Sequence, residues 1–271
     1  MPDTPKRKGA VRISEIPTAI LKQLNTGAIE SVNLTEWLAV DQRALLMNVL
    51  PALNLAEAVA PAFAQVSALK KRTQMQCLPV IAAVLLETLK PQKNRNKLLA
   101  ALIAHPSDTV RCWAAYVIGL DDTLSLEEKL MQLRPIATDQ NSGVREIAWM
   151  AVRTDLEAQL AHAVTLLTEW TKEQDANLRR FASEATRPRG VWCKHIETLK
   201  QNPEIAYPIL APLKSDESKY VRDSVANWLN DASKSQPDWV REVCALWTEE
   251  SPTQETQAII KRALRTIGSE K

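Results

Sequence analysis

Val144-Arg145-Glu146-Ile147-Ala148 is the stretch that decides the fold, because the chain repeats it in altered form along its length. The other copies are Val110-Arg111-Cys112-Trp113-Ala114, Leu178-Arg179-Arg180-Phe181-Ala182 and Val221-Arg222-Asp223-Ser224-Val225. Their arginines are successively 34, 34 and 43 residues apart. A period in this range is typical of stacked helical pairs. The pattern therefore predicts an all-α fold, a right-handed α-solenoid of HEAT-like helical pairs with a concave groove.

The composition favours helices and excludes several classes of protein. Apolar residues make up 45% of the chain, enough for a sizeable core, and only 6 glycines are present. The formal net charge is +2, so any basic patch must be local. The basic N-terminus has no apolar segment behind it, and the longest apolar run, residues 78–86, is too short to span a bilayer. We expect a cytoplasmic protein that makes no membrane contact and has reduced cysteines.

Three segments are expected along the chain. Residues 1–12 are predicted to form a disordered tail, residues 13–92 an N-terminal helical region, and residues 93–271 the HEAT-like repeat array. The last two segments are predicted to form one continuous solenoid domain. Each repeat has two helices joined by a turn that carries Asp or Asn, the residue types that cap helix N-termini. The scattered cysteines and histidines show no metal-ligand spacing, so we expect neither a metal nor a cofactor.

The third repeat carries charged residues away from its apolar stripe. At 100° per residue, Arg180, Glu184 and Arg187 lie within about 60° of one another on the expected helix of residues 176–186. Further candidates for contact with an anion follow the helix: Arg189, Trp192 and Lys194. Two interpretations remain open. One is a solvated face on which Glu184 pairs with the arginines at i−4 and i+3, and the other is a phosphate clamp beside a carboxylate and an aromatic ring.

The fourth repeat has polar residues beside its apolar layer. On the expected helix of residues 221–231, Ser224, Asn227 and Asp231 share one side. Asp231 has two possible roles: it caps the element that follows, or it acts on a nearby cation, because charge at the edge of an apolar layer is poorly screened.

The second repeat places a large aromatic residue off its apolar stripe. Trp149 shares a side of the helix with Glu146 and Arg153, at a position where the other repeats carry alanine or serine. An aromatic side chain on the groove side of such an array indicates contact with a ligand, unless it packs against the neighbouring repeat. The sequence leaves both interpretations of Trp149 open.

Two of these runs resemble a known family. The run from Arg179 to Arg189 is similar to the RRxxSEGxRPR motif of the AlkC branch of the HEAT-like DNA alkylation-repair glycosylases. The run from Tyr220 to Asp231 resembles that family's YVRxSVANxLND motif, and the opening of the chain is similar to the family's N-terminal region. The resemblance covers nearly the whole chain. It implies a glycosylase that excises cationic alkylated purines, such as 3-methyladenine, from duplex DNA without a metal or a redox cofactor.

The resemblance also implies roles for individual residues. Glu184 and Asp231 match acidic positions of the family and are the expected catalytic carboxylates. Such groups stabilise the oxocarbenium-like deoxyribose that forms as a cationic base leaves. Trp149 stands near the place where family members carry a further acid. The array reaches the end of the sequence, so we expect no β-sandwich domain of the kind that some relatives have. The expected DNA-binding residues are Arg180, Arg187, Arg189, Trp192, Trp149, Arg153, Lys194 and Asn227.

Two other functions fit the sequence. The first alternative is a non-catalytic HEAT-repeat protein that binds damaged or branched DNA, which would show salt-dependent binding without base release. The second is a protein-binding helical scaffold, for which the near-neutral net charge is the best support. The arginines on either side of Pro188, beside Trp192, favour DNA over a protein partner. We expect a monomer whose partner is duplex DNA containing alkylated purines.

Overall fold

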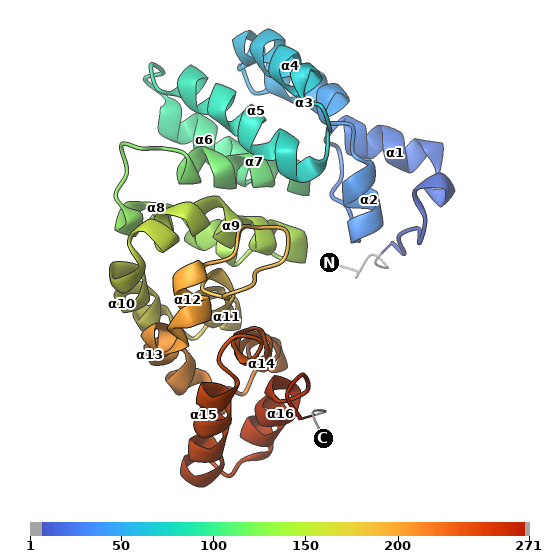
Figure 1. Ribbon diagram of the computed structural model, residues 1–271. Helices are drawn as coiled ribbons and strands as arrows, with labels where there is room; N and C mark the ends of the chain where they lie inside the picture. The colour runs from blue at the N-terminus through green and yellow to red at the C-terminus, as the bar shows by residue number, and fades with distance from the viewer. Residues whose placement is uncertain (1–6, 269–271) are drawn as a thin grey trace. The chain divides into compact units, whose positions relative to one another are not determined.

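Helices make up the regular structure of the chain. The computed structural model describes residues 7–268, and within that range it contains α-helices and short 3-10 helices but no strand (Figure 1). The prediction of an all-α array of HEAT-like helical pairs is confirmed. No helix in the described range is long and apolar enough to cross a membrane.

Contacts divide the chain into two compact units. The first runs to Ser125 and includes Asp139–Ala151, and the second comprises Leu126–Thr138 and the chain from Val152 onward. This division falls inside the predicted repeat array and not at its predicted start near residue 93. Helix α9 (Ser142–Ala158) passes from the first unit into the second.

The first unit contains, in chain order, η1 (Ile13–Glu15), α1 (Thr18–Asn25), α2 (Leu34–Ala39), α3 (Gln42–Ala52), η2 (Ala56–Ala58), α4 (Val59–Ala68), α5 (Gln74–Leu89), α6 (Arg95–Ile103) and α7 (Asp108–Gly119). The second unit contains α8 (Leu126–Ala137), α10 (Leu160–Trp170), α11 (Ala176–Ala185), α12 (Glu197–Gln201), η3 (Pro203–Ala206), α13 (Tyr207–Leu210), η4 (Ala211–Leu213), α14 (Lys219–Ser233), α15 (Pro237–Glu250) and α16 (Gln254–Ala263).

The segment that precedes η1 is held against α2. Arg7 forms an ion pair with the buried Glu36, and Asn33 Nδ2 donates to the carbonyl of Ala10 over 2.9 Å. Part of the predicted disordered tail, residues 7–12, thus makes contacts with the region of α2, and these contacts leave no local signal because their partners lie more than 20 residues away in sequence. The rest of the predicted tail, residues 1–6, lies outside the described residues.

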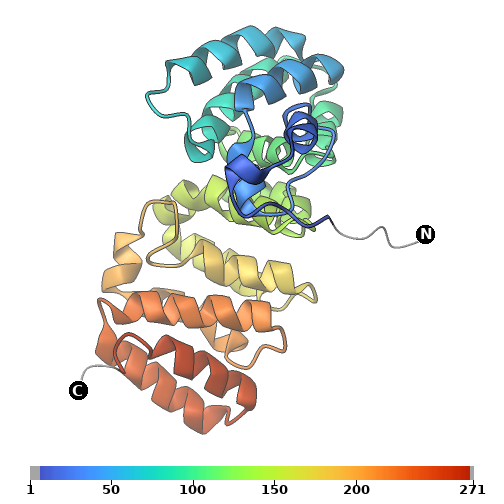
Figure 2. The same cartoon turned by 90° about the vertical axis from the view of Figure 1, so that its right-hand side faces the viewer.

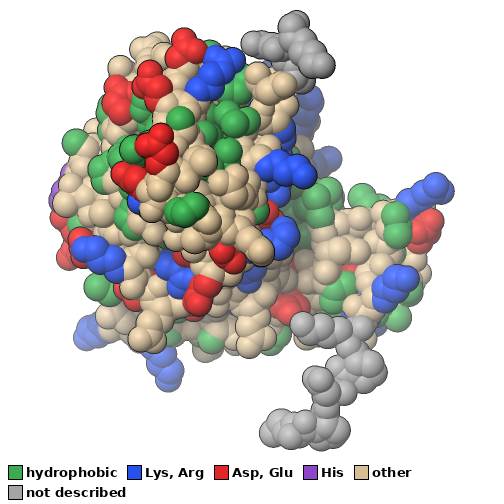
Figure 3. Space-filling view, turned by 90° about the horizontal axis from the view of Figure 1, so that it is seen from below, with side chains coloured by type: hydrophobic (Ala, Val, Ile, Leu, Met, Phe, Trp, Pro, Cys, Tyr) green, Lys and Arg blue, Asp and Glu red, His purple; other side chains and the backbone are tan. Residues whose placement is uncertain are grey.

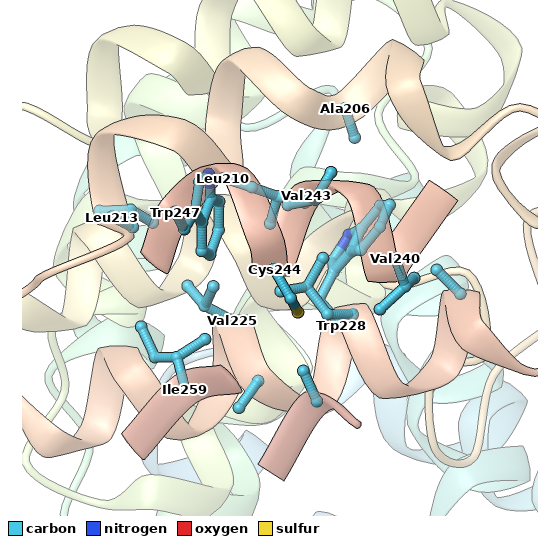
Figure 4. Packing of buried hydrophobic residues seen from close by; sticks show 14 of the residues in the cluster. Ala206, Leu210, Leu213, Val225, Trp228, Val240, Val243, Cys244, Trp247 and Ile259 are labelled. Carbon is cyan, nitrogen blue, oxygen red and sulfur yellow. The ribbon is translucent and has the colours of Figure 1, made fainter. Parts of the chain in front are cut away.

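In the second unit, the second helices of successive pairs pack on one another. Helix α14 packs against both α11 and α16, and Figure 2 shows the helices from α10 to α16 in successive layers. The core of this unit includes Trp228 and Trp247, both fully buried, with Val225 and Ile259 nearby (Figure 4). Replacing a buried tryptophan by alanine costs about 3–5 kcal/mol. This packing therefore fixes the position of α14.

The repeated arginine has the same structural role in every copy. Each one donates from Nη1 to the two backbone carbonyl groups six and five residues before it, over 2.6–3.0 Å. These carbonyls lie in the turn before the second helix of the repeat, where the helices offer them no partner. Two copies also pair with an aspartate of the next turn: Arg111 with Asp139 and Arg179 with Asp216, each at 2.7 Å. The motif recurs because it closes one turn and, in these two copies, ties it to the next repeat.

Candidate functional site

Two buried carboxylates share one guanidinium where α11 packs against α14. Arg187 Nη1 donates to Glu184 Oε1 over 2.7 Å, and Arg187 Nη2 and Nε donate to Asp231 Oδ2 over 2.7 and 2.9 Å. Glu184 lies in the last turn of α11, and Arg187 follows the end of that helix, while α14 supplies Asp231. Glu184 is only 4% exposed and Asp231 only 5%. We call Glu184 and Asp231, joined by Arg187, the bridged carboxylate pair.

The structure matches neither interpretation of the charged residues in the third repeat in full, although it contains the expected pairing of Glu184 with two arginines. Glu184 pairs with both arginines, because Arg180 Nη2 also lies 3.5 Å from Glu184 Oε2. These ion pairs are buried, whereas the charged side chains of a solvated face would be exposed to water. Arg187 is 9% exposed and its guanidinium is turned to the two carboxylates, so it does not face outward as a phosphate contact would. Asp231 lies within α14 and accepts hydrogen bonds from the side chains of Arg187 and Lys234. A capping residue would instead accept hydrogen bonds from backbone N–H groups at the start of a helix.

Further hydrogen bonds hold the carboxylate oxygens that Arg187 does not reach. Ser224 Oγ donates to Glu184 Oε2 over 2.6 Å, and Ser183 Oγ donates to Ser224 Oγ over 2.8 Å. Lys234 Nζ lies 3.1 Å from Asp231 Oδ1. Every carboxylate oxygen of the pair therefore has a hydrogen-bond partner. Groups that are satisfied in this way keep one orientation in the folded protein.

The surroundings of Glu184 keep it ionised although it is buried. Burial alone raises the pKa of the Glu184 carboxyl group, but the charges of Arg180 and Arg187 and the hydrogen bonds from Ser224 and Arg187 outweigh it, so that the pKa falls below its usual value of 4.5. The same pairing raises the pKa of Arg187, because the attraction of Glu184 and Asp231 exceeds the effect of burial. The site thus holds permanent charges in a poorly solvated place.

The lowered pKa of Glu184 makes a prediction about acid stability. A carboxyl group whose pKa is depressed in the folded state contributes stability above its unfolded pKa, and that contribution is lost as the pH falls through the folded-state pKa. We expect the difference in unfolding free energy between the wild type and Glu184→Gln to shrink between pH 7 and about pH 3. Urea unfolding at both pH values measures it. A difference that does not change with pH would contradict the assignment.

Arg153 holds the loop that follows α11. Its Nη1 donates to the carbonyl of Ala185 over 2.7 Å, its Nη2 to that of Arg187 over 2.6 Å, and its Nε to that of Lys194 over 3.0 Å. Arg153 is only 4% exposed, so its side chain does not lie on the surface, where the predicted contact with DNA would place it. The loop passes so close that a side chain on Gly190 would lie 3.2 Å from Arg153 Nη2. Arg153 therefore positions the backbone of residues 185–194.

Removal of these hydrogen bonds should open the loop to protease. Trypsin can cleave after Arg189 and Lys194 but not after Arg187, because Pro188 follows it. We expect Arg153→Gln to speed cleavage after Arg189 by at least about tenfold, because one hydrogen bond from a charged donor contributes about 1.5 kcal/mol or more. Mass spectrometry of the first fragments measures this. Arg134→Gln, which removes a surface pair with Glu173, is the control, and equal cleavage of both variants would refute the role of Arg153.

The same loop carries three further candidates, Arg189, Trp192 and Lys194. Trp192 is 53% exposed and has a φ of 60°, in the left-handed region that residues other than glycine seldom occupy. Lys194 is exposed and lies 3.4 Å from Glu157. Arg189 donates to the carbonyl of Asp231 over 3.3 Å and to Ser235 Oγ over 2.7 Å. Arg189 thus lies beside the bridged carboxylate pair.

Trp149 is buried, as one of the two interpretations of the sequence allowed. It belongs to the first compact unit, is 1% exposed, and donates from Nε1 to Glu146 Oε2 over 2.9 Å. The structure therefore favours packing over a ring that faces a ligand. Trp113, which lies on the apolar stripe of its repeat, is also fully buried.

Sequence reasoning missed several residues that shape the site. Ser183 and Arg153 gave no signal of their roles, since their partners are backbone or lie far away in sequence. Asn227, predicted to contact DNA, accepts a hydrogen bond from Arg262 of α16 over 3.2 Å, a contact that the sequence did not indicate. Among the described residues, no group of three or more His, Cys, Asp and Glu side chains could hold a metal ion.

The fold and this site define a helical-repeat protein with a buried, arginine-bridged acidic pair on its second helices. The chain belongs to the family described as DNA alkylation repair enzyme, which matches residues 72–267. The family suggested by the two sequence motifs is thereby confirmed. A relative in Bacillus subtilis (strain 168), the uncharacterized protein YhaZ, is 44% identical over 117 residues, which are 43% of this chain and 32% of that protein.

Two solved structures share the fold. The Pseudomonas fluorescens alkylpurine DNA glycosylase AlkC, bound to DNA containing an abasic site analog, has a TM-score of 0.69 and 24% identity, over 95% of this chain and 65% of that one. AlkD2 from Streptococcus mutans has a TM-score of 0.58 and 24% identity, over 77% of this chain and 96% of that one. The chain thus spans about a third of YhaZ and less than two thirds of AlkC.

Proposed function

We propose that this protein is a DNA glycosylase that excises cationic alkylated purines of the 3-methyladenine type from duplex DNA. The observation that carries the proposal is the bridged carboxylate pair, in which the buried Glu184 accepts hydrogen bonds from Arg187 and Ser224. Membership of the DNA alkylation repair family supports DNA as the partner. Action as a cytoplasmic monomer without metal is part of the same proposal.

The chemistry requires fixed negative charge beside the sugar. An alkylated purine with a positive charge is already a good leaving group, so the barrier lies in the deoxyribose, which becomes oxocarbenium-like as the bond breaks. Preorganised charge at such a place lowers the barrier without reorganisation, and it acts most strongly where water is excluded. Glu184 and Asp231 are proposed to supply this charge. Their hydrogen bonds hold both groups in place before DNA arrives.

Cationic side chains surround the bridged carboxylate pair. Two carboxylates and Arg187 leave one net negative charge, and Arg180 and Lys234 turn this into one net positive charge in the free protein. The Lys234 side chain is 42% exposed, so a phosphate can compete with Asp231 for it. We propose that DNA phosphates pair with the cations at the outer edge of the site. These cations then offset Glu184 and Asp231 less, so the electrostatic potential at the sugar becomes more negative. These cations are Arg180, Arg189, Lys194 and Lys234.

Trp192 is proposed to contact the damaged nucleotide. Its ring is exposed on a loop that Arg153 holds, and its backbone has an unfavourable conformation. Strain of this kind persists where the surrounding structure fixes it, often at functional sites. An indole face attracts a cationic base by a cation–π interaction of about 0.5–2 kcal/mol.

The proposal is tested by release of free base. Purified protein is incubated with methylated duplex DNA, and free 3-methyladenine and 7-methylguanine are measured against time by chromatography. The proposal expects release well above the spontaneous rate measured without protein. Release at the spontaneous rate would show that the protein does not act as a glycosylase on this DNA.

A second candidate is a non-catalytic protein that binds damaged or branched DNA. Two points favour it: Arg187 and Lys234 offset the two carboxylates, and the buried Trp149 stands near the place where the family resemblance implies a further acid. It expects tight binding to DNA containing an abasic site with no base release. The same preparation and the same DNA distinguish the two functions.

A further inference from the structure

The second helices of the last two helical pairs, α14 and α16, meet through a polar contact. This contact is separate from the bridged carboxylate pair. Helix α14 turns a stripe of polar side chains at i, i+4 and i+7 toward α16: Asp223, Asn227 and Asn230. Helix α16 and the residues just after it bring two arginines at i and i+3 to this stripe, Arg262 and Arg265. Residues with these spacings share one face of a helix.

Amide oxygens hold both guanidinium groups. Asn227 Oδ1 accepts from Arg262 Nε over 3.2 Å and from Arg265 Nη2 over 3.3 Å. Asn230 Oδ1 accepts from Arg265 Nε over 3.0 Å. The Asn230 side chain is itself fixed, because Asn230 is 1% exposed and its Nδ2 donates to the carbonyl of Ala263 over 3.1 Å. The two arginines are thus oriented before any ligand binds.

An amide orients a guanidinium group without neutralising its charge. Arg265 makes no ion pair with any residue in the range 7–268, and Arg262 shares Asp223 with Lys219. Three cationic side chains and one carboxylate therefore leave two positive charges at this place. A carboxylate in place of Asn227 would form stronger hydrogen bonds with the arginines. The amides thus preserve a local positive charge in a chain whose formal net charge is only +2. Figure 3 shows one face of the molecule, on which both signs of charge are mixed.

We infer that Arg262 and Arg265 form a binding site for backbone phosphates of duplex DNA. The inference rests on the proposed function for the nature of its partner. Asn227 lies one helical turn before Asp231 on α14, so a strand held here passes close to the bridged carboxylate pair. The guanidinium groups supply the phosphate contacts, and Asn227 and Asn230 position them. Arginine suits this role, because its planar group retains donors for a phosphate while other donors are engaged.

The test measures binding to an undamaged duplex, so it needs no base release. Fluorescence anisotropy gives the dissociation constant at several salt concentrations between about 50 and 200 mM, and the slope of log K against log salt reports the number of phosphate contacts. We expect Arg265→Gln to reduce that slope by about 0.9 and to weaken binding several-fold on every DNA sequence. Arg241→Gln removes an exposed arginine of α15 and serves as the matched control.

Asn227→Asp separates the charge of the site from its structure. The substitution keeps the shape and gives both arginines a stronger acceptor, so the melting temperature should hold or rise. It also neutralises positive charge, so DNA binding should weaken and the salt slope should fall. A purely structural role for the two arginines predicts unchanged binding in this variant.

Three results would overturn the inference. The first is a salt slope equal to that of the wild type in both Arg265→Gln and Asn227→Asp. The second is a loss of DNA affinity in Arg241→Gln as large as that in Arg265→Gln. The third is absence of duplex binding by the wild type. If the wild type binds DNA through Arg265 but releases no base, the phosphate site stands and the proposed glycosylase fails. The two proposals therefore fail separately.

Discussion

Glu184→Gln should slow the release of 3-methyladenine from methylated duplex DNA by about 100-fold, the size of effect seen when one preorganised electrostatic group is removed from an active site. Glutamine keeps the shape of the side chain and can still accept a hydrogen bond from Ser224, but it has no charge to offer the sugar. The rate is measured in single turnover, with protein in excess over DNA, so that product release does not enter.

A matched control separates this effect from general loss of charge. Asp238→Asn removes a carboxylate of α15 whose side chain is 87% exposed and pairs with Arg241, outside the bridged carboxylate pair, and should leave the rate unchanged. A Glu184→Gln protein that works at more than half the wild-type rate would show that the carboxylate has no part in the reaction. Affinity for abasic DNA, measured in parallel, shows whether the variant still binds.

Arg187→Gln should destabilise the protein by about 3 kcal/mol, because removal of one partner from a buried ion pair leaves charge uncompensated. Two carboxylates depend on this guanidinium, and both are almost fully buried. Urea unfolding at pH 7 gives the free energy of unfolding. Arg187→Lys should lose less, since it keeps the charge but cannot reach both carboxylates in the same geometry.

The surface pair of Arg134 and Glu173 provides the comparison for Arg187. Its side chains are about one third exposed, and such pairs contribute about 0–1 kcal/mol. If Arg187→Gln cost no more than Arg134→Gln, the bridge would not hold the two carboxylates. The bridged carboxylate pair would then be an incidental contact between α11 and α14.

The sequence predicts the helical array well because its signal is local. The apolar stripe on each second helix and the recurrence of the motif arginine follow from contacts a few residues apart, such as the bond from Arg179 to the carbonyl of Glu173. The pairing of Glu184 with Arg180 and Arg187 was one of two interpretations, again at helical spacing. Each of these features is visible without knowledge of the tertiary fold.

Contacts between distant segments could not be predicted in the same way. Arg187 reaches Asp231 across 44 residues, and Arg153 reaches the carbonyl of Arg187 across 34. Both arginines resemble outward phosphate contacts in the sequence, because nothing in one chain marks which carbonyl or carboxylate will come to face them. Trp149 was ambiguous for the same reason, since burial by a neighbouring element leaves no local signal.

The claim that Glu184 and Asp231 work as one site is tested most directly by a double-mutant cycle on the rate of base release. The wild type, Glu184→Gln, Asp231→Asn and the double variant are compared on methylated duplex. Groups that act as a unit lose most of their effect with the first substitution. The account predicts release by the wild type above the spontaneous rate and a double variant little slower than either single one. No release by the wild type, or losses that multiply in the double variant, would contradict it.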